Sequence, residues 1–204
     1  PGVFFLSPEE FHRRMARRMR EHPRSLLATA THDNKRGEDA RARLAVLSEV
    51  PNLWKDFASI GPAEAGRGEG RGMEGPDATD HYMLLQTLVG AWPPGLKADD
   101  REGIESFLAR VAAWQVKALR EGKRRSSWVS PNSEYEEACG GYLKRLAEHA
   151  AAPGSLLLRA EHMAASLAPA GAVNSLSQTL LRLTAPGVPD LYQGTDGWDY
   201  SMVD

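Results

Sequence analysis

Four titratable side chains, His32, Asp33, Lys35 and Arg36, stand close together near the start of the chain. They directly follow residues 25–31, an apolar or β-branched run that is nearly free of charge, and they precede a helical pattern. Parallel α/β barrels display their functional residues in this way, at the carboxyl ends of buried strands. The arrangement is therefore that expected of a functional site at the end of a strand that covers residues 26–31.

The same pattern also fits a solvent-exposed turn between a strand and a helix. In that interpretation Asp33 or Asn34 only caps the helix that begins near Gly37. The spacing of the residues does not decide between a functional site and a cap.

Composition excludes several classes of partner. The 204 residues hold 25 Lys and Arg against 27 Asp and Glu, so the net charge of −2 shows no basic footprint for nucleic acid or for an acidic membrane. The one cysteine, Cys139, excludes an internal disulfide and fits a small buried residue better than a nucleophile. No apolar run reaches membrane-spanning length and no signal-peptide core is present, which indicates a soluble, cytoplasmic protein. Both ends of the sequence read as cut from something longer.

Most of the chain carries a helical pattern of apolar residues. Ser7, Pro8 and Glu10 form a helix start with a capping box, and Ser133 with Glu136 repeats that box further on. An apolar stripe on the first helix consists of Phe11, Met15 and Met19. The expected helices cover residues 7–22, 37–50, 79–92, 99–121, 133–151, 156–168 and 174–185, with Pro51 ending the second and residues 169–171 separating the last two.

Residues 60–76 interrupt this pattern, because they hold six glycines and almost no side chain that could be buried. Such a segment cannot offset the entropy of ordering its backbone, so we expect a flexible loop. A phosphate-binding function is not supported, since the segment lacks a GK[ST] sequence and a preceding strand.

The expected fold class is mainly α, with a helical subdomain and two short strands. The strands are residues 26–31 and 188–192, and the long connection between them implies that the helical subdomain is inserted. The predicted division is a segment 1–55 with the first strand, a flexible loop 56–78, an inserted helical subdomain 79–170, and a segment 171–204 with the last helix and strand.

Several motifs in order along the chain are those of a known family. Residues 27–43 read LATATHDNKRGEDARAR and residues 186–195 read PGVPDLYQGT. The intervening motifs are Lys117 to Glu121, Ser127-Trp128, Pro131-Asn132, Tyr135-Glu136 and Asn174 to Leu181. Together they resemble maltooligosyl trehalose synthases, which belong to the alpha-amylase clan of glycoside hydrolases. The first motif resembles the strand-seven motif of that family.

The resemblance implies that the chain is a C-terminal piece of a (β/α)8 catalytic barrel. The parent enzyme would convert the reducing-end α-1,4 linkage of a maltooligosaccharide to α,α-1,1 without a cofactor or metal. Asp33 would be the third carboxylate of the clan, and His32 would hydrogen-bond the same sugar. The nucleophile and the general acid would lie on earlier strands, outside this chain, so the piece alone should be inactive. Its expected partners are the maltooligosaccharide substrate and the remainder of the barrel.

Further sugar-binding residues are expected nearby. Lys35 and Arg36 would bind hydroxyls or carboxylates, although solvated charges of a first helical turn fit them about equally well. Trp54, Trp128 and Tyr192 could stack on glucose rings, but core packing is the commoner role of large aromatics; Trp128 and Tyr192 are retained as substrate-binding candidates.

The sequence departs from the family pattern at four positions. Asn34 stands where threonine is usual, Gly37 where serine is, Arg125 where histidine is, and Asp196 where glutamate is. The pair Glu161-His162 looks like an acid and a base, but it falls in a helix that the resemblance does not mark, so we expect it at the surface.

Two alternatives of other classes remain. A helical metal-dependent phosphohydrolase would use His32 and Asp33 with a further histidine, such as His12 or His22, and another aspartate as metal ligands. The strand before His32 and the positive charge of Lys35 and Arg36 disfavour it. A non-catalytic helical binding module is the second alternative.

Overall fold

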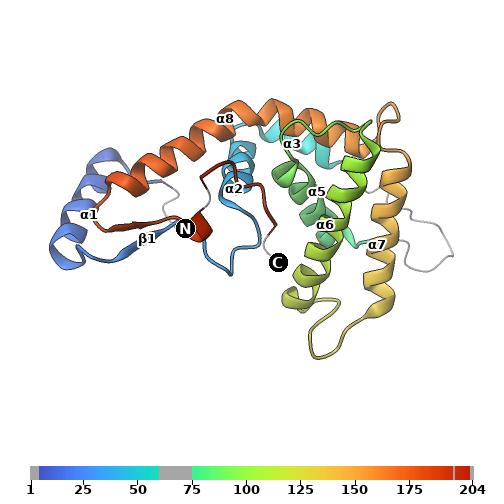
Figure 1. The fold of residues 1–204 in the computed structure, drawn as a ribbon, viewed down its shortest axis with the longest axis horizontal. Coiled ribbons are helices and arrows are strands. Elements are labelled where there is room, and N and C mark those ends of the chain that lie inside the picture. Colours follow the sequence, from blue (N-terminus) through green and yellow to red (C-terminus); the bar gives the residue numbers. More distant parts are fainter. Residues whose placement is uncertain (1–4, 60–74, 195, 203–204) are drawn as a thin grey trace.

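The computed structural model describes residues 5–59, 75–194 and 196–202. Within these ranges the chain is mainly α-helical and has two short strands, as the sequence predicts. The elongated molecule is spanned by α8 (Leu156–Thr184), which arches over the other elements from the helices at one end to the strand pair at the other (Figure 1). In the described part of the chain, no helix is long and apolar enough to cross a membrane.

The first helix, α1 (Pro8–Glu21), begins where the sequence predicts. The Ser7 side chain accepts a hydrogen bond from the Glu10 amide at 3.2 Å, and Pro8 occupies the first helical position. The predicted apolar stripe is only partly covered within the described chain, since Phe11 and Met15 are half-buried and Met19 is 58% exposed.

The two strands, β1 (Leu26–Ala28) and β2 (Val188–Asp190), pair in parallel. Leu26 lies opposite Val188, and Ala28 lies opposite Asp190. The prediction that two distant strands lie side by side is confirmed, but the prediction of a buried strand over 26–31 is wrong. The observed strands have three residues each and none of these is buried, because a two-stranded sheet leaves both faces and both outer edges largely open.

Three short elements follow β1: α2 (Glu38–Ala45), the 3-10 turn η1 (Val46–Ser48) and α3 (Pro51–Ala58). The helical segment formed by α2 and η1 ends shortly before Pro51, as predicted, and Pro51 also starts the next helix. A proline needs no amide partner at the first helical position, so the residue that ends one helical segment can open the next. Trp54 and Phe57 of α3 are buried in the core.

The core lies among α5 (Ala78–Ala91), α6 (Arg101–Gly122), α7 (Ser133–Glu148) and the first half of α8. Its most buried side chains are Leu84, Leu85, Leu88, Ile104, Phe107, Val111, Trp114, Tyr142, Leu156 and Leu157. Helix α7 starts at the predicted place with a different cap: Asn132 accepts the hydrogen bond of the Tyr135 amide at 3.1 Å. The predicted box of Ser133 and Glu136 is therefore wrong, and Glu136 binds Arg120 instead.

Helix α8 is one helix of 29 residues where the sequence predicts two. Pro169 lies inside it and removes one backbone hydrogen bond, which the helix tolerates because α8 packs closely on α2. At Gly171 a Cβ atom would lie 3.0 Å from the Arg43 Cα, and the side-chain amide of Asn174 donates to the Ala42 carbonyl at 3.2 Å. These contacts hold the backbone helical through the predicted break.

The predicted flexible loop falls on residues 60–76, of which residues 60–74 lie outside the described residues. Gly75 and Pro76 are buried just before α5. At the other end of the chain β2 leads into the turn η2 (Tyr192–Gly194), and residues 196–202 then return to α2.

Candidate functional site

The segment after β1 is a tight turn that presents His32 and Asp33 to solvent. The Asn34 side chain accepts a hydrogen bond from the Thr31 amide at 2.7 Å, and the Asn34 amide donates to the Thr31 carbonyl at 3.1 Å. The side chains of His32 and Asp33 are 81% and 82% exposed, with 3.5 Å between His32 Nε2 and Asp33 Oδ2. The turn therefore displays an imidazole and a carboxylate together.

The alternative role of Asp33 or Asn34 as a helix cap is wrong. Helix α2 has Gly37 at its N-cap position and no bond from a cap side chain. A carboxylate from the other end of the chain takes that place, since Asp199 Oδ2 accepts a hydrogen bond from the Glu38 amide at 3.1 Å. Asp199 also leaves no room for a side chain at Gly37, which accounts for glycine at this position in the described conformation.

Arg36 anchors the turn to the helical core. Its guanidinium donates to the Met83 carbonyl at 3.3 Å and to Thr87 Oγ1 at 2.8 Å, and it lies over the Trp114 ring, 5.2 Å from the centroid. Burial lowers the pKa of Arg36 from its usual value. Trp114 in turn donates its indole N–H to the Lys35 carbonyl at 2.8 Å. Arg36 is thus neither a solvated charge nor free to bind a ligand in this conformation.

Lys35 ties the turn to the C-terminal end of α6. Its Nζ atom lies 2.6 Å from Glu121 Oε2 and donates to the Asp33 carbonyl at 3.4 Å. Lys35 therefore holds the backbone that carries the Asp33 carboxylate. In Figure 1 the turn passes beside this lower end of α6.

Trp128 lies beyond that same end of α6, on the surface. Its side chain is 56% exposed, so the expectation of core packing is wrong for Trp128, whereas it is confirmed for Trp54. The Arg120 guanidinium lies 5.0 Å from the centroid of the Trp128 ring and is itself fixed by two hydrogen bonds of 2.8 and 2.7 Å to Glu136. Arg120 therefore contacts the Trp128 ring, and more than half of the side chain remains accessible to solvent.

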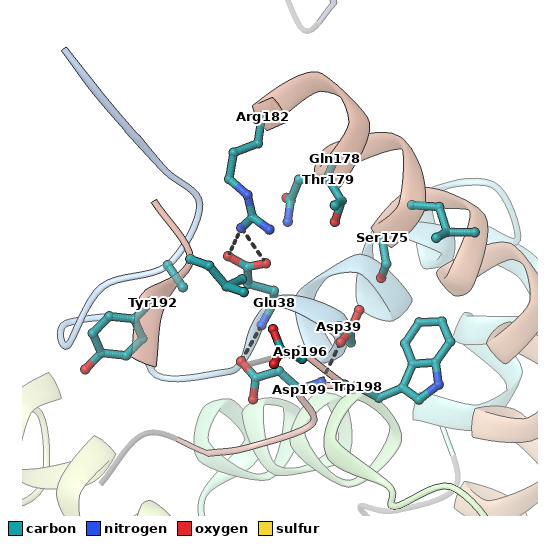
Figure 2. A pocket seen from close by; sticks show the side chains of 14 residues that line it. Glu38, Asp39, Ser175, Gln178, Thr179, Arg182, Tyr192, Asp196, Trp198 and Asp199 are labelled. Carbon is teal, nitrogen blue, oxygen red and sulfur yellow. Dashed lines mark hydrogen bonds and ion pairs between the residues drawn. The ribbon is translucent and has the colours of Figure 1, made fainter. Parts of the chain in front are cut away.

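A pocket of about 360 Å³ lies where β1 and β2 end, between the start of α2, the second half of α8 and the C-terminal segment (Figure 2). Of the six predicted site residues only Tyr192 lines it. His32, Asp33, Lys35, Arg36 and Trp128 are not part of its wall, so the structure does not bring all six residues into one cavity. The side chains labelled in Figure 2 are Glu38, Asp39, Ser175, Gln178, Thr179, Arg182, Tyr192, Asp196, Trp198 and Asp199.

A buried ion pair closes one side of this pocket. Arg182 Nη1 lies 2.9 Å from Glu38 Oε1 and 3.1 Å from Oε2, and it donates to Thr29 Oγ1 at 2.6 Å. Thr29 also hydrogen-bonds Glu38. The network joins α8, α2 and the residue after β1. Sequence reasoning missed Glu38 and Arg182, which are 144 positions apart; the acidic first turn of α2 was the only local signal.

The remaining reactive side chains have structural roles. Glu161 is 9% exposed and accepts hydrogen bonds from the Ala98 amide at 2.8 Å and Lys97 at 3.1 Å, so its predicted surface position is wrong; it anchors the turn before α6. Cys139 is buried as expected, and burial raises its pKa to about 12. Arg125 donates to the Asp77 carboxylate at 3.0 Å. Among residues 5–59, 75–194 and 196–202, no three side chains gather as metal ligands.

Comparisons with known proteins, by sequence and by structure, find relatives whose names describe the same kind of enzyme. Over its whole length the chain is 38% identical to a Mycobacterium tuberculosis protein with the name "putative maltooligosyl trehalose synthase", of which it covers 24%. The structure of maltooligosyltrehalose synthase from Arthrobacter ramosus is 34% identical with a TM-score of 0.73, over 98% of this chain and 23% of that one. DSM5389 glycosyltrehalose synthase is 32% identical with a TM-score of 0.74, over 96% and 24%. A scan of the chain against models of protein families gives no match.

In sequence and in fold the chain thus corresponds to one segment, about a quarter, of a larger enzyme. The enzymes in question are maltooligosyl trehalose synthases, so the resemblance drawn from the motifs is confirmed.

Proposed function

We propose that this chain is the C-terminal part of the catalytic region of a maltooligosyl trehalose synthase. The whole enzyme would move the reducing-end glucose of a maltooligosaccharide from an α-1,4 to an α,α-1,1 linkage within the same molecule. The observation that carries the proposal is the 38% identity over all 204 residues, which includes the turn with His32 and Asp33.

Asp33 is proposed as the third carboxylate of the site. Its exposed carboxylate can accept hydrogen bonds from sugar hydroxyls, and its negative charge can stabilise an oxocarbenium-like transition state. The turn is preorganised for this role, because Lys35 and Arg36 fix its backbone to α6 and α5. Binding residues that are held before substrate arrives lose less freedom when it binds.

Retaining transfer also needs a nucleophilic carboxylate and a carboxylic acid, about 5 Å apart. We assign neither role to a residue of this chain, and the family resemblance assigns both to earlier barrel strands. The open edges of β1 and β2 offer unpaired backbone groups to which further strands could bond. In the proposal, the remainder of the barrel pairs there and brings the two missing carboxylates opposite Asp33.

Trp128 is the proposed platform for a glucose unit of the same substrate. An exposed indole covers the apolar face of a pyranose, and the Arg120 guanidinium next to it can bind hydroxyls. The main role proposed for Lys35 is to support the turn, because its Nζ atom is paired with Glu121 at 2.6 Å. Sugar binding is its proposed secondary role.

The test uses a chimera in which this chain replaces the corresponding segment of the Arthrobacter ramosus enzyme. With maltopentaose as substrate, we expect formation of non-reducing product, and in the Asp33→Asn chimera a kcat lower by orders of magnitude. The unfolding temperature should be unchanged, because an exposed carboxylate that acts in the transition state contributes little to stability.

Asp56→Asn is the matched control, since Asp56 is an exposed aspartate on α3. A folded chimera that retains full turnover after Asp33→Asn would overturn the proposed role of Asp33. The 204-residue chain by itself should convert no maltopentaose; conversion that Asp33→Asn abolishes would mean that this chain contains the nucleophile and the acid.

A further inference from the structure

The pocket in Figure 2 offers a buried hydrogen-bonding group that the fold leaves unused. Ser175 of α8 is 8% exposed, and its hydroxyl has no hydrogen-bond partner in the described structure. An unpaired buried hydroxyl is costly, so such a group points to a ligand or water in the adjoining space. Figure 2 shows the Ser175 hydroxyl directed toward Asp39 of α2, across the pocket.

Further polar groups from three elements surround this hydroxyl. Gln178 and Thr179 lie one turn further along α8 and are half-buried on the same side of the helix as Ser175 (Figure 2). Asp39 faces them from α2; its Oδ2 accepts a hydrogen bond from the Asp199 amide at 2.5 Å. The pocket thus combines hydroxyl and amide donors with carboxylate acceptors, the set that binds neighbouring hydroxyls of a polyol.

The charges of the pocket disfavour an anionic ligand. Four carboxylates line it, those of Glu38, Asp39, Asp196 and Asp199, against the one cation Arg182. Arg182 is already paired with Glu38 at 2.9 Å and is 5% exposed, so its charge is not available to a phosphate or a carboxylate. Glu38 is paired with Arg182, and Asp39 and Asp199 already accept hydrogen bonds from backbone amides, so a neutral ligand with hydroxyl groups fits the pocket better than an anion.

An aromatic ring stands at each end of the pocket. Trp198 is 55% exposed and lies on the side of Ser175, and Tyr192 lies on the opposite side (Figure 2). The Tyr200 ring flanks Trp198 with centroids 6.5 Å apart and planes tilted by 31°. A flat exposed ring suits the apolar face of a pyranose. The cavity of about 360 Å³ falls within the range of about 300–1,000 Å³ typical of small-molecule sites.

We propose that this pocket binds a glucosyl unit of a neutral α-glucan, stacked on Trp198 and hydrogen-bonded by Ser175 and Asp39. The choice of an α-glucan rests on the proposed function; the neutral saccharide class follows from the pocket. Sugar hydroxyls would accept from Ser175 and donate to Asp39, and this would satisfy the unpaired Ser175 hydroxyl.

The experiment is a titration of the 204-residue chain with maltotriose, followed by tryptophan fluorescence and by calorimetry. We expect saturable binding that Ser175→Ala weakens up to about tenfold, the loss of one hydrogen bond of up to 1.5 kcal/mol. Trp198→Ala should weaken binding by at least as much. Ser177→Ala, which changes an exposed serine of the same helix, should leave the affinity unchanged. Circular dichroism establishes that each variant is folded.

Three outcomes would overturn the proposal. One is the absence of saturable binding, and the second is an affinity that neither Ser175→Ala nor Trp198→Ala changes. In the latter case a loss of binding in Trp128→Ala would place the sugar at the Asp33 turn, which would support the proposed function while refuting this pocket. The third is equal or tighter binding of glucose 6-phosphate, which would contradict the charge argument. Turnover of the chimera tests the proposed function independently of all three.

Discussion

Two regions of this chain have similar apolar patterns and opposite environments. The helical block, which we define as α5, α6, α7 and residues 156–168, buries Leu84, Leu85, Leu88 and Leu157 completely. The strand region, defined as residues 8–28, 173–184 and 188–190, leaves most of its large apolar side chains in solvent. Those at least 45% exposed are Met19, Leu26, Val173, Leu176, Leu180, Leu181, Leu183 and Val188.

The contrast shows what an apolar pattern does and does not specify. The spacing of apolar residues predicts the type of element and which of its faces must be covered, because a helix or strand with one apolar face needs a surface to pack against. It does not specify whether that surface belongs to the same stretch of chain. In the helical block the partners are present, and in the strand region the described chain does not provide them, which agrees with a segment that covers about a quarter of its relatives.

Helix α2 joins the two regions. Arg43 is 3% exposed and donates to the carbonyls of Val89, Gly90 and Trp92 at 2.8–3.1 Å, at the C-terminal end of α5. Its guanidinium also lies 4.0 Å from the centroid of the Tyr200 ring. Helix α2 is therefore held by the helical block, as is the Asp33 turn before it through Arg36 and Lys35, although the strand that precedes the turn belongs to the other region.

The largest difference between the two regions should appear in stability. Leu88→Ala removes a fully buried side chain from the helical block and should lower the free energy of unfolding by about 2–5 kcal/mol. Leu180→Ala makes the same chemical change in the strand region, where Leu180 is 63% exposed, and should stay within about 0.5 kcal/mol. Urea unfolding followed by circular dichroism measures both. Comparable losses in the two variants would show that the strand region is covered in solution, for example by a second copy.

A smaller effect is expected where the helical block holds the Asp33 turn. Arg36→Met removes two hydrogen bonds of a partly buried cation and should cost about 1.5–3 kcal/mol. Amide hydrogen exchange of residues 31–36 should accelerate with it, because the turn loses its anchor on α5.

Arg24→Met supplies the control, since Arg24 is exposed on the strand region and should leave both measurements unchanged. Unaltered exchange at residues 31–36 in Arg36→Met would mean that the Lys35–Glu121 pair and the Trp114 bond hold the turn alone.

Features with local causes could be predicted from the sequence. The start of α1 follows from Ser7, Pro8 and Glu10, whose interactions span only three positions. The parallel pairing of the strands was predicted from two short β patterns and the long connection between them. Features with distant causes were missed. The continuity of α8 through Pro169 depends on its packing against Arg43, more than 120 positions earlier.

The same distinction holds for the candidate site. The sequence identified His32 and Asp33 as an exposed pair after a strand, and the structure has them there. It could not identify the anchoring of Arg36, because the partners of Arg36 are on α5 and α6 and no local pattern marks an arginine that is anchored in this way. The pocket was missed for a similar reason: Ser175 and Asp39 line the same pocket only because α8 packs on α2.

The smallest effect is a pH dependence that should belong to the helical block alone. His81 of α5 is 3% exposed, and its Nε2 atom lies 3.0 Å from the hydroxyl of Tyr142. Burial lowers the pKa of His81 below its usual value, because the charged imidazolium is poorly solvated there. Above a pH of about 6.5 the imidazole is neutral in the folded and the unfolded state, so it adds no pH dependence. As the pH falls below about 6.5 the unfolded state takes up a proton that the folded state resists, and stability falls until the pH passes the pKa of the folded state.

Unfolding free energies from urea titrations at pH 7.5, 6.5 and 5.5 measure this slope above the range in which most carboxylates titrate. His81→Gln keeps a hydrogen-bonding side chain and removes the titration, so the fall in stability toward pH 5.5 should diminish. His22→Gln changes an exposed histidine of the strand region and should leave the slope as it is in the unmodified chain. The opposite result would be a pH dependence of stability that disappears with His22→Gln and persists with His81→Gln. It would mean that the strand region is buried in solution, and it would contradict the contrast between the two regions. A slope that persists in both variants would mean that His81 takes up its proton as readily in the folded chain as in the unfolded one, and that water reaches the ring beside Tyr142.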